Sequence, residues 1–310
     1  MTASQRSAGP IRRVGFVGLG HMGGPMCAHL VRAGFEVMAY DLDRVAVQRA
    51  HQLGATPAAS VSECATNAQA LITMLPGPPQ VEAVLLGESR GVEALVPGAL
   101  LIDMSTSSRA LGLRILDAAA SRDVAFLDAP VAGQAIGARA GTLAIYVGGE
   151  RDDLERARPL FETVGDPGRI KHVGSHGAGY TVKLLLNLLW FIQSVATGEV
   201  LGTGLRAGLK LESLHEALVS SPANSNFLAR DVLPVLSDGD YDDAFPMRMV
   251  SKDLALAVDL ARDVGMPVEL SALVEQVHRR ARARFGDDAG EISAVRLYEE
   301  LAGTLFRFRS

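Results

Sequence analysis

One lysine lies at the edge of a strongly apolar segment. Lys183 opens the run 183–193 (KLLLNLLWFIQ), in which every other residue except Asn187 and Gln193 is large and apolar. A charged amine beside such a surface is costly unless it snorkels to water, pairs or loses its proton. A helix would place Asn187, four residues on, on the same face as Lys183. The segment therefore predicts either a snorkelling lysine beside a core helix or an amine held for acid–base chemistry.

A second candidate for chemistry is the glycine-rich turn 18–23 (GLGHMG). It follows a predicted strand and opens a predicted helix, which is the context in which this spacing binds a dinucleotide. Gly18 permits the tight turn, Gly20 lets the backbone approach a pyrophosphate, and Gly23 allows close packing of helix on strand. The helix N-terminus adds amide donors for phosphate. The turn predicts a dinucleotide site, and a plain glycine turn is the alternative.

An acidic residue follows the second predicted strand. Asp41 lies 21 residues after Gly20, where a carboxylate can accept hydrogen bonds from the ribose hydroxyls of adenosine. The same charge repels the 2′-phosphate of NADP, and Asp43 adds to this repulsion, whereas Arg44 opposes it. The sequence therefore favours NAD as the cofactor and leaves NADP as the alternative.

The elements that position these residues alternate between two periodicities in the first half of the chain. Short apolar runs predict strands, and amphipathic patterns between most of them predict helices. Strands are predicted at 13–18, 36–40, 70–74, 100–103, 125–129, 143–147 and 170–173. Helices are predicted at 25–33, 43–53, 81–86, 108–122 and 152–161, and Gly34 is expected to end the first in a left-handed conformation. Such alternation predicts a Rossmann-type, doubly wound and mainly parallel sheet with helices on both faces.

After residue 173 only helical patterns follow. They cover 180–205, 211–220, 227–236, 249–264, 270–284 and 292–305. The chain is therefore predicted to be an α/β protein with a flexible N-terminus (1–10), a dinucleotide-binding domain (11–174) and an all-helical domain for substrate and oligomerisation (175–310). A long helix over about 178–205, which carries Lys183, is expected to join the two. Ligand sites favour such domain junctions.

Composition argues against several functional classes. The 310 residues carry a formal net charge of -5, which gives no basic surface for nucleic acid. A local basic run, 278–284 (HRRARAR), has a helical pattern and is interpreted as a solvated helix face. The uncharged stretch 184–198 falls short of the ~20 apolar residues that span a membrane. We expect a cytoplasmic protein, because no apolar signal core precedes residue 11 and the two cysteines, Cys27 and Cys64, suit a reducing compartment.

Four segments, in this order, resemble the motifs of one enzyme family. They are the cofactor motif 15–26 (GFVGLGHMGGPM), the substrate motif 128–142 (DAPVAGQAIGARAGT), the catalytic motif 177–187 (GAGYTVKLLLN) and the distal cofactor motif 252–259 (KDLALAVD). From Val14 to about Val295 the chain is thereby similar to the β-hydroxyacid dehydrogenases, which include 3-hydroxyisobutyrate dehydrogenases and tartronate semialdehyde reductases. The resemblance implies an NAD- or NADP-dependent enzyme that works as a homodimer or homotetramer.

The resemblance also assigns roles to residues. It implies that Lys183 is the catalytic residue, that Asn187 helps to hold the substrate, and that Lys252 closes over the cofactor. Thr106 matches a position near both the nicotinamide and the substrate carboxylate. The remaining positions that match cofactor contacts are Gly18, Leu19, Gly20, His21, Met22, Gly23, Asp41, Leu75, Pro76 and Gln80.

The substrate motif departs from the family pattern at two positions. The family usually has Asp-Ala-Pro-Val-Ser-Gly-Gly, whereas this chain has Ala132 and Gln134 in place of the serine and the last glycine. Ala132 has no hydroxyl for a substrate carboxylate, Gly133 keeps a backbone amide, and Gln134 adds a side-chain amide. Either backbone amides suffice and Gln134 faces solvent, or the substrate preference is shifted. Asp128, at the start of the motif, is interpreted as structural.

The chemistry that these residues imply is hydride transfer to or from a nicotinamide cofactor, for which the protein supplies orientation and a proton route. Burial and the nearby positive nicotinamide ring both lower the pKa of a lysine, so Lys183 can take the hydroxyl proton of a β-hydroxy acid. The reverse reaction reduces a semialdehyde or β-keto acid. Two alternatives stay open: an NADPH-preferring reductase of short aldehyde acids such as glyoxylate or succinic semialdehyde, and a non-catalytic dinucleotide-binding scaffold. No metal is expected, because no carboxylate or cysteine joins His172 and His176.

Overall fold

The chain divides into two compact units, Met1–Lys183 and Leu184–Ser310, which are described separately. The computed structural model describes residues 9–241 and 245–308. Most of the N-terminal segment that is predicted to be flexible, residues 1–8, therefore lies outside the described residues.

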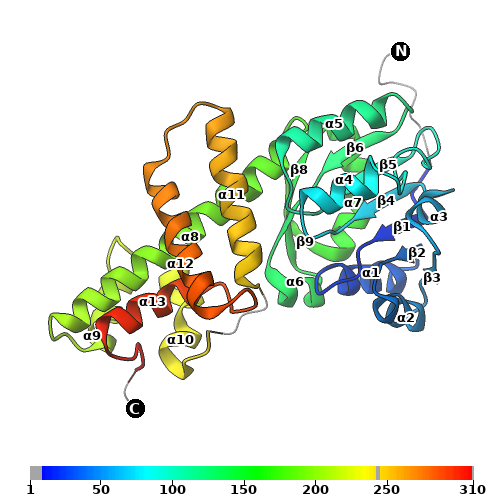
Figure 1. The fold of residues 1–310 in the computed structure, drawn as a ribbon. Helices are drawn as coiled ribbons and strands as arrows, with labels where there is room; N and C mark the ends of the chain where they lie inside the picture. Colours follow the sequence, from blue (N-terminus) through cyan, green and yellow to red (C-terminus); the bar gives the residue numbers. More distant parts are fainter. Residues whose placement is uncertain (1–8, 242–244, 309–310) are drawn as a thin grey trace. The chain divides into compact units, whose positions relative to one another are not determined.

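Among the described residues, the first unit contains one nine-stranded sheet (Figure 1). Its strands are β1 (Arg13–Val17), β2 (Glu36–Tyr40), β3 (Thr56–Pro57), β4 (Ala70–Thr73), β5 (Leu100–Asp103), β6 (Ala125–Asp128), β7 (Val131–Ala132), β8 (Leu143–Gly148) and β9 (Gly165–Gly174). Their order is β3-β2-β1-β4-β5-β6-β8-β7, with β9 paired to β8. Pairing is parallel from β3 to β6, antiparallel between β8 and both β6 and β7, and parallel between β8 and β9. The sheet is mainly parallel, as predicted.

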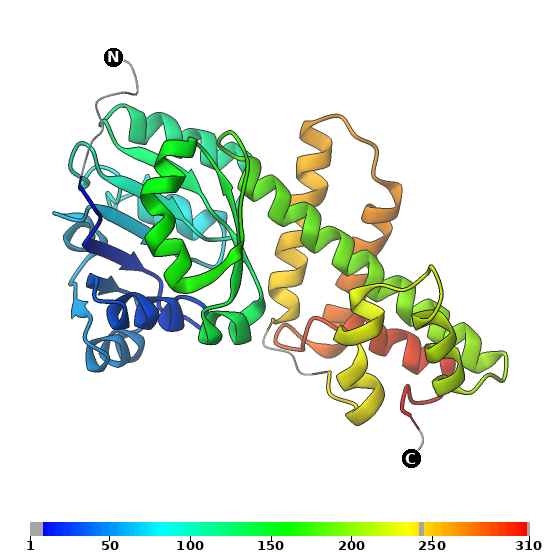
Figure 2. The same cartoon turned by 180° about the vertical axis from the view of Figure 1, so that it is seen from behind.

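The side chains of successive residues in the central strands pack alternately into two hydrophobic cores, one on each face of the sheet. In β5, Leu100 and Ile102 belong to one buried cluster and Leu101 to the other. The first cluster takes side chains from α1 (Gly23–Arg32), α2 (Arg44–Gln52) and α7 (Arg151–Val164), and Figure 2 shows α7 lying across the sheet. The second takes side chains from α3 (Val61–Ala65), α4 (Pro78–Leu85) and α5 (Arg109–Ala120). This arrangement confirms the predicted doubly wound fold.

The strand order creates a switch point between β1 and β4. The chain leaves β1 toward β2 on one side and leaves β4 toward β5 on the other. Open α/β sheets bind ligands at the carboxyl ends of the strands at such a point. The glycine-rich turn 18–23 follows β1 and Leu75 follows β4, so both predicted cofactor segments start at this edge.

Four short elements have patterns too brief to be predicted from periodicity. They are β3, β7, α3 and α6 (Gln134–Ala140), which hold two to seven residues each. The predicted end of the first helix is confirmed, because α1 stops at Arg32 and Gly34 follows with a φ of 90°.

The second unit is helical over its described residues. Its helices are α8 (Ala178–Arg206, which begins in the first unit), α9 (Leu211–Val219), a π-helical segment η2 (Phe227–Asp231), α10 (Leu233–Asp238), α11 (Met247–Asp263), α12 (Glu269–Phe285) and α13 (Ser293–Ala302). The single helix predicted over 227–236 is wrong in detail, since it is divided at Val232. Pro234 has no N–H to continue the first segment, but it suits the first turn of a new helix.

One face of α8 is a core face within the second unit. Leu184, Leu188, Phe191 and Val195 are buried at helical spacing in a cluster with α11, α12 and α13. By length and composition alone α8 is also apolar enough to cross a membrane, a test that core helices of water-soluble proteins pass as well. The buried stripe is the property expected of a core helix.

Candidate active site

The glycine-rich turn after β1 has the close backbone contacts that its motif requires. Gly18 has a φ of 97°, and its N–H donates to the Tyr40 carbonyl oxygen at 3.0 Å. A Cβ at Gly23 would overlap the Gly18 carbonyl oxygen, so only glycine lets α1 begin this close to the turn. A Cβ at Gly20 would meet nothing within 4 Å. The backbone at Gly20 is therefore open to a large ligand, and the turn fits the pyrophosphate of a dinucleotide.

Asp41 holds the turn in place. Its Oδ2 accepts the Leu19 N–H at 2.6 Å and its Oδ1 accepts the Asp43 N–H at 2.8 Å. Each carboxylate oxygen keeps a further lone pair for a ribose hydroxyl. The sequence spacing between Gly20 and Asp41 did not predict that Asp41 also binds the backbone of the turn. The other predicted cofactor positions in this unit are half-buried or exposed: His21, Met22, Pro76 and Gln80.

The loops after β4 and β5 are tied together by side-chain hydrogen bonds. The Leu75 N–H donates to Ser105 Oγ at 2.8 Å, and the Ser105 hydroxyl donates to Asp103 Oδ1 at 2.5 Å. The Thr73 hydroxyl donates to the same carboxylate oxygen at 2.7 Å. Thr106 follows Ser105 directly and is half-buried. The structure thus places Leu75 and Thr106, both predicted to be near the cofactor, on loops that share a buried anchor.

Asp128 fixes the start of α8. Its Oδ1 accepts the Gly177 N–H at 2.7 Å and its Oδ2 accepts the Tyr180 N–H at 3.1 Å. The first N–H groups of a helix lack partners within the helix, so a buried acceptor stabilises that end. Asp128 is fully buried, which agrees with its interpretation as structural. Lys183 follows within two turns and is half-buried.

Asp128→Asn is expected to be destabilised most at low pH. Burial raises the pKa of Asp128 to about 6 from 3.8, so the folded protein binds this proton more tightly than the unfolded chain does. The resulting stability, about 3 kcal/mol at 1.36 kcal/mol per pKa unit, is present below about pH 4 and is lost as the pH rises through about 6.

In urea titrations, the difference in free energy of unfolding between wild type and Asp128→Asn is therefore expected to shrink from pH 4 to pH 7. Burial also raises the pKa of Asp103, but Asp103 is present in both proteins and its contribution cancels. A difference that stays constant over this range contradicts the raised pKa of Asp128.

The predicted substrate loop has an unusual backbone. Ala132 ends β7 and is half-buried, and Gly133 follows with a φ of 132°. Gln134 has a φ of 54° and an exposed side chain. A side chain in this left-handed conformation costs roughly 1–2 kcal/mol. The chain thus keeps the backbone that a glycine favours at 134 while it presents a longer side chain there.

In the second unit, one buried carboxylate joins two predicted site residues. Asn187 donates through Nδ2 to Asp253 Oδ2 at 2.7 Å, and Lys252 Nζ forms an ion pair with Asp253 Oδ1 at 2.9 Å. Asp253 is 1% exposed, so this charge is stable only with such partners. Asp253 was not predicted, although an acid on the apolar face of a helix, between Val250 and Leu254, is a signal that could have found it.

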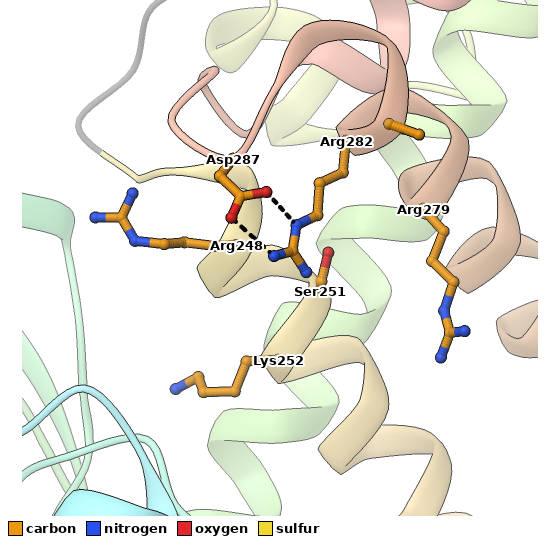
Figure 3. Close-up of a pocket in the computed structure, with 7 residues that line it drawn as sticks. Arg248, Ser251, Lys252, Arg279, Arg282 and Asp287 are labelled. Carbon is orange, nitrogen blue, oxygen red and sulfur yellow. Dashed lines mark hydrogen bonds and ion pairs between the residues drawn. The ribbon is translucent and has the colours of Figure 1, made fainter.

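Lys252 also lines a surface pocket of about 560 Å³ in the second unit (Figure 3). Most of the side chains that line this pocket are cationic. Asp287, the acidic residue of the lining, accepts two hydrogen bonds from Arg282, at 2.8 and 3.0 Å. The lining residues are Arg248, Ser251, Lys252, Arg279, Arg282, Ala283 and Asp287. The basic run 278–284 supplies part of this wall.

The prediction that the whole of this basic run is solvated is wrong at His278 and Ala281, which are both fully buried. His278 is fully buried, its Nδ1 lies 3.0 Å from the Val274 carbonyl oxygen, and its ring packs edge-on against Phe191. The arginines do lie outward, as Arg279 and Arg284 are exposed and pair with acidic side chains. Helical spacing places position 278 on the same face as the buried positions 274 and 281.

The two histidines considered for a metal bind backbone oxygens instead. His172 Nε2 lies 2.7 Å from the Gly149 carbonyl oxygen, and His176 Nε2 lies 3.0 Å from that of Phe126. Within the described part of the chain, no group of three or more His, Cys, Asp or Glu side chains is placed to hold a metal ion.

Two family models match this chain, one in each half of the sequence. Residues 13–174 match the family model of the NAD binding domain of 6-phosphogluconate dehydrogenase. Residues 177–298 match the family model described as NAD-binding of NADP-dependent 3-hydroxyisobutyrate dehydrogenase.

Individual relatives are similar over most of their length. A 3-hydroxyisobutyrate dehydrogenase of Pseudomonas aeruginosa is 38% identical over 271 residues, which are 85% of this chain and 90% of that protein. An NAD-dependent L-serine dehydrogenase of the same organism is 34% identical over 275 residues, 87% and 92% of the two chains. The structure of Mycobacterium tuberculosis 3-hydroxyisobutyrate dehydrogenase with L-serine has a TM-score of 0.86 and 31% identity, and the match covers 93% of this chain and 99% of that one. The chain therefore belongs to the β-hydroxyacid dehydrogenase family of NAD(P)-dependent oxidoreductases that act on CH–OH groups.

Proposed function

We propose that this enzyme interconverts a small β-hydroxy acid and its semialdehyde or β-keto form with NAD, and that Lys183 is the general acid–base residue. The proposal is carried by the position of the lysine, half-buried on α8 shortly after the two N–H groups that Asp128 binds. Such an anchored helix start gives the amine a defined place, and proton transfer depends on placement within hydrogen-bond reach.

The proton route follows from the chemistry of an amine. Bound NAD⁺, which the turn 18–23 would hold, would supply the acceptor for the hydride that leaves the substrate carbon. The neutral amine of Lys183 takes the hydroxyl proton as the C–H bond breaks, so the alcohol becomes a carbonyl and the amine an ammonium. In reduction the ammonium returns this proton to the carbonyl oxygen. We assign substrate binding to Asn187 and cofactor binding to Lys252, and their shared partner Asp253 would orient both.

The preference for NAD rests on Asp41. Its carboxylate is held at the end of β2 by two amide groups, so it is not free to turn away from an approaching 2′-phosphate. Asp43 accepts the Val45 N–H at 2.9 Å as the N-cap of α2, which fixes a second negative charge nearby. Arg44 begins α2 and is exposed, so it is the one feature of this segment that favours NADP.

The proposed substrate class is supported by two relatives and by the loop 132–134. Two relatives are named for 3-hydroxyisobutyrate and L-serine, which are both β-hydroxy acids with a primary alcohol and differ in the group on the α-carbon. With alanine at 132, the carboxylate is proposed to bind backbone amides such as that of Gly133, and Gln134 to contact the variable group. We also propose a homodimer or homotetramer, because Leu185 and Leu189 expose apolar surface on α8. The proposed compartment is the cytoplasm, which the two free cysteines, Cys27 and Cys64, suit.

A screen of NAD⁺ and NADP⁺ reduction tests this function directly. The panel contains 3-hydroxyisobutyrate, glycerate, L-serine, L-threonate and 4-hydroxybutyrate, each with both cofactors. We expect turnover of at least one β-hydroxy acid, with the higher kcat/KM for NAD⁺. A higher kcat/KM with NADP⁺ contradicts the cofactor assignment and favours the short-aldehyde reductase. Tight NADH binding without turnover of any substrate favours the non-catalytic scaffold.

A further inference from the structure

Three segments that carry predicted site residues meet at one buried carboxylate, that of Asp103. It ends β5 and is fully buried. Its Oδ1 accepts from Thr73, which ends β4, and from Ser105, which precedes Thr106. Its Oδ2 accepts the hydroxyl of Tyr180 at 2.6 Å. Tyr180 lies in the first turn of α8, so one side chain links two loops of the sheet edge to the helix that carries the catalytic motif.

The protons of this cluster all point toward Asp103. Ser105 Oγ accepts the Leu75 N–H at 2.8 Å, so its own proton is left to donate to the carboxylate. Burial and the adjacent Asp103 charge raise the pKa of Tyr180 well above its usual value, so the phenol keeps its proton and donates it. A carboxylate with three hydroxyl donors needs no cation nearby, whereas the loss of one donor leaves a buried acceptor open.

The ring of Tyr180 is buried and packs closely against α5. A Cβ at Gly112 of α5 would lie 2.7 Å from ring atom Cε2, closer than packed carbon atoms approach. The backbone of the same residue is held by Asp128, and Asp128 is the register partner of Asp103 on the neighbouring strand. Two adjacent buried carboxylates therefore hold the backbone and the side chain of one residue, three positions before Lys183.

We propose that Asp103 and Tyr180 are positioning residues for the reaction, which join the first turn of α8 to the loops after β4 and β5 and so set the place of the Lys183 amine. This rests on the proposed function, because it requires Lys183 to transfer the proton. Residues three apart on a helix lie on neighbouring positions of its surface, so a shift of the Tyr180 turn moves the amine. A misplacement of about 1 Å can cost on the order of 10²-fold in rate.

Tyr180→Phe is the sharpest test, since it keeps the ring and removes only the hydroxyl. We expect kcat to fall on the order of 10-fold, while KM for NAD⁺ changes little, because the turn 18–23 is untouched. The apparent pKa in the pH profile of kcat is expected to be displaced from that of wild type, because it reports the base in the enzyme–substrate complex. Asp103→Asn, whose amide can donate to the phenol oxygen, is expected to retain more of kcat than Tyr180→Phe.

The matched control is Tyr241→Phe in the second unit. Tyr241 is also a buried tyrosine whose hydroxyl donates to a carboxylate, that of Glu299, at 2.9 Å. We expect it to lower the thermal midpoint but to leave kcat and its pH profile unchanged. Tyr180→Phe with the same behaviour as this control overturns the proposal. If Tyr180→Phe does not fold, Gly112→Ala replaces it, because the added methyl displaces the ring without removing the hydroxyl; wild-type kcat and pH profile in that variant likewise overturn the proposal.

The Lys183→Ala variant separates this proposal from the proposed function. An inactive Lys183→Ala together with wild-type behaviour of Tyr180→Phe removes only the positioning role. Full activity of Lys183→Ala removes both, because no proton transfer by Lys183 is then left to position. Inactivity of Lys183→Ala with a reduced kcat and displaced pH profile of Tyr180→Phe supports both.

Discussion

Lys183→Ala is expected to lower kcat for oxidation of the hydroxy acid on the order of 10²–10⁴-fold, the usual contribution of a general base. The side chain is half-buried and the helix is anchored upstream by Asp128, so the thermal midpoint is expected to stay close to that of wild type. The measurement is steady-state reduction of NAD⁺ beside a thermal melt of the same sample. Near-normal kcat with an intact melt excludes Lys183 as the base.

Two further lysine variants identify the cause of the loss. Lys183→Arg keeps a positive charge and a long side chain, but a guanidinium does not become neutral at working pH. It is expected to be as slow as alanine if proton transfer is the role, and largely active if the role is only charge. Lys210→Ala replaces an exposed lysine outside the site and is expected to behave as wild type.

Gly23→Ala is expected to weaken cofactor binding strongly and to destabilise the fold. The added Cβ would overlap the Gly18 carbonyl oxygen and approach its carbonyl carbon to 3.0 Å, and these are backbone atoms that move only with the turn. Overpacking of this kind costs roughly 1–3 kcal/mol. We expect a lower thermal midpoint and a Kd for NADH raised by at least about 100-fold, since the backbone amides of the turn, which we propose to bind the pyrophosphate, are displaced.

Gly20→Ala is the matched control for that result. A methyl at this position meets no protein atom within 4 Å, so the melt is expected to match wild type. NADH binding, followed by fluorescence titration, is nevertheless expected to weaken, because the methyl occupies the approach of the pyrophosphate to the backbone. Wild-type affinity in Gly20→Ala contradicts the placement of the dinucleotide on this turn.

The sheet could be predicted because its strands are short apolar runs between helical patterns. β2 and β5 have the predicted bounds, and most other strands differ at their ends by one residue. Beside the unpredicted two-residue strands β3 and β7, β9 differs most, as only its last part was predicted. It begins Gly165-Asp-Pro-Gly168, and residues of this kind usually mark turns, so a strand here depends on pairing with β8.

The candidate site could be predicted only where residues are adjacent in sequence. The turn 18–23 and the segment around Lys183 carry their own spacing, and the structure gives both the expected local form. Asp103, Tyr180 and Asp253 escaped prediction because each has a partner that is distant in sequence. Asp103 binds Thr73, 30 residues away, and Tyr180, 77 residues away, and Asp253 binds Asn187, 66 residues away. A single acidic residue in an apolar strand or helix indicates that it has a hydrogen-bond partner, because buried polar groups are paired. Which residue is the partner depends on the order of the strands, which the sequence pattern does not give.

The backbone of the loop 132–134, which we propose to contact the substrate, also limits the side chains that this loop can carry. Position 132 belongs to a strand, and the extended backbone of a strand accepts nearly any side chain. Most amino acids can therefore replace Ala132 without backbone strain. Position 134 has a left-handed backbone, which glycine, asparagine and aspartate adopt easily and valine, isoleucine and threonine resist. In laboratory evolution of this loop, we therefore expect many residue types to be recovered at position 132 and only a few at position 134, with every substrate used for selection.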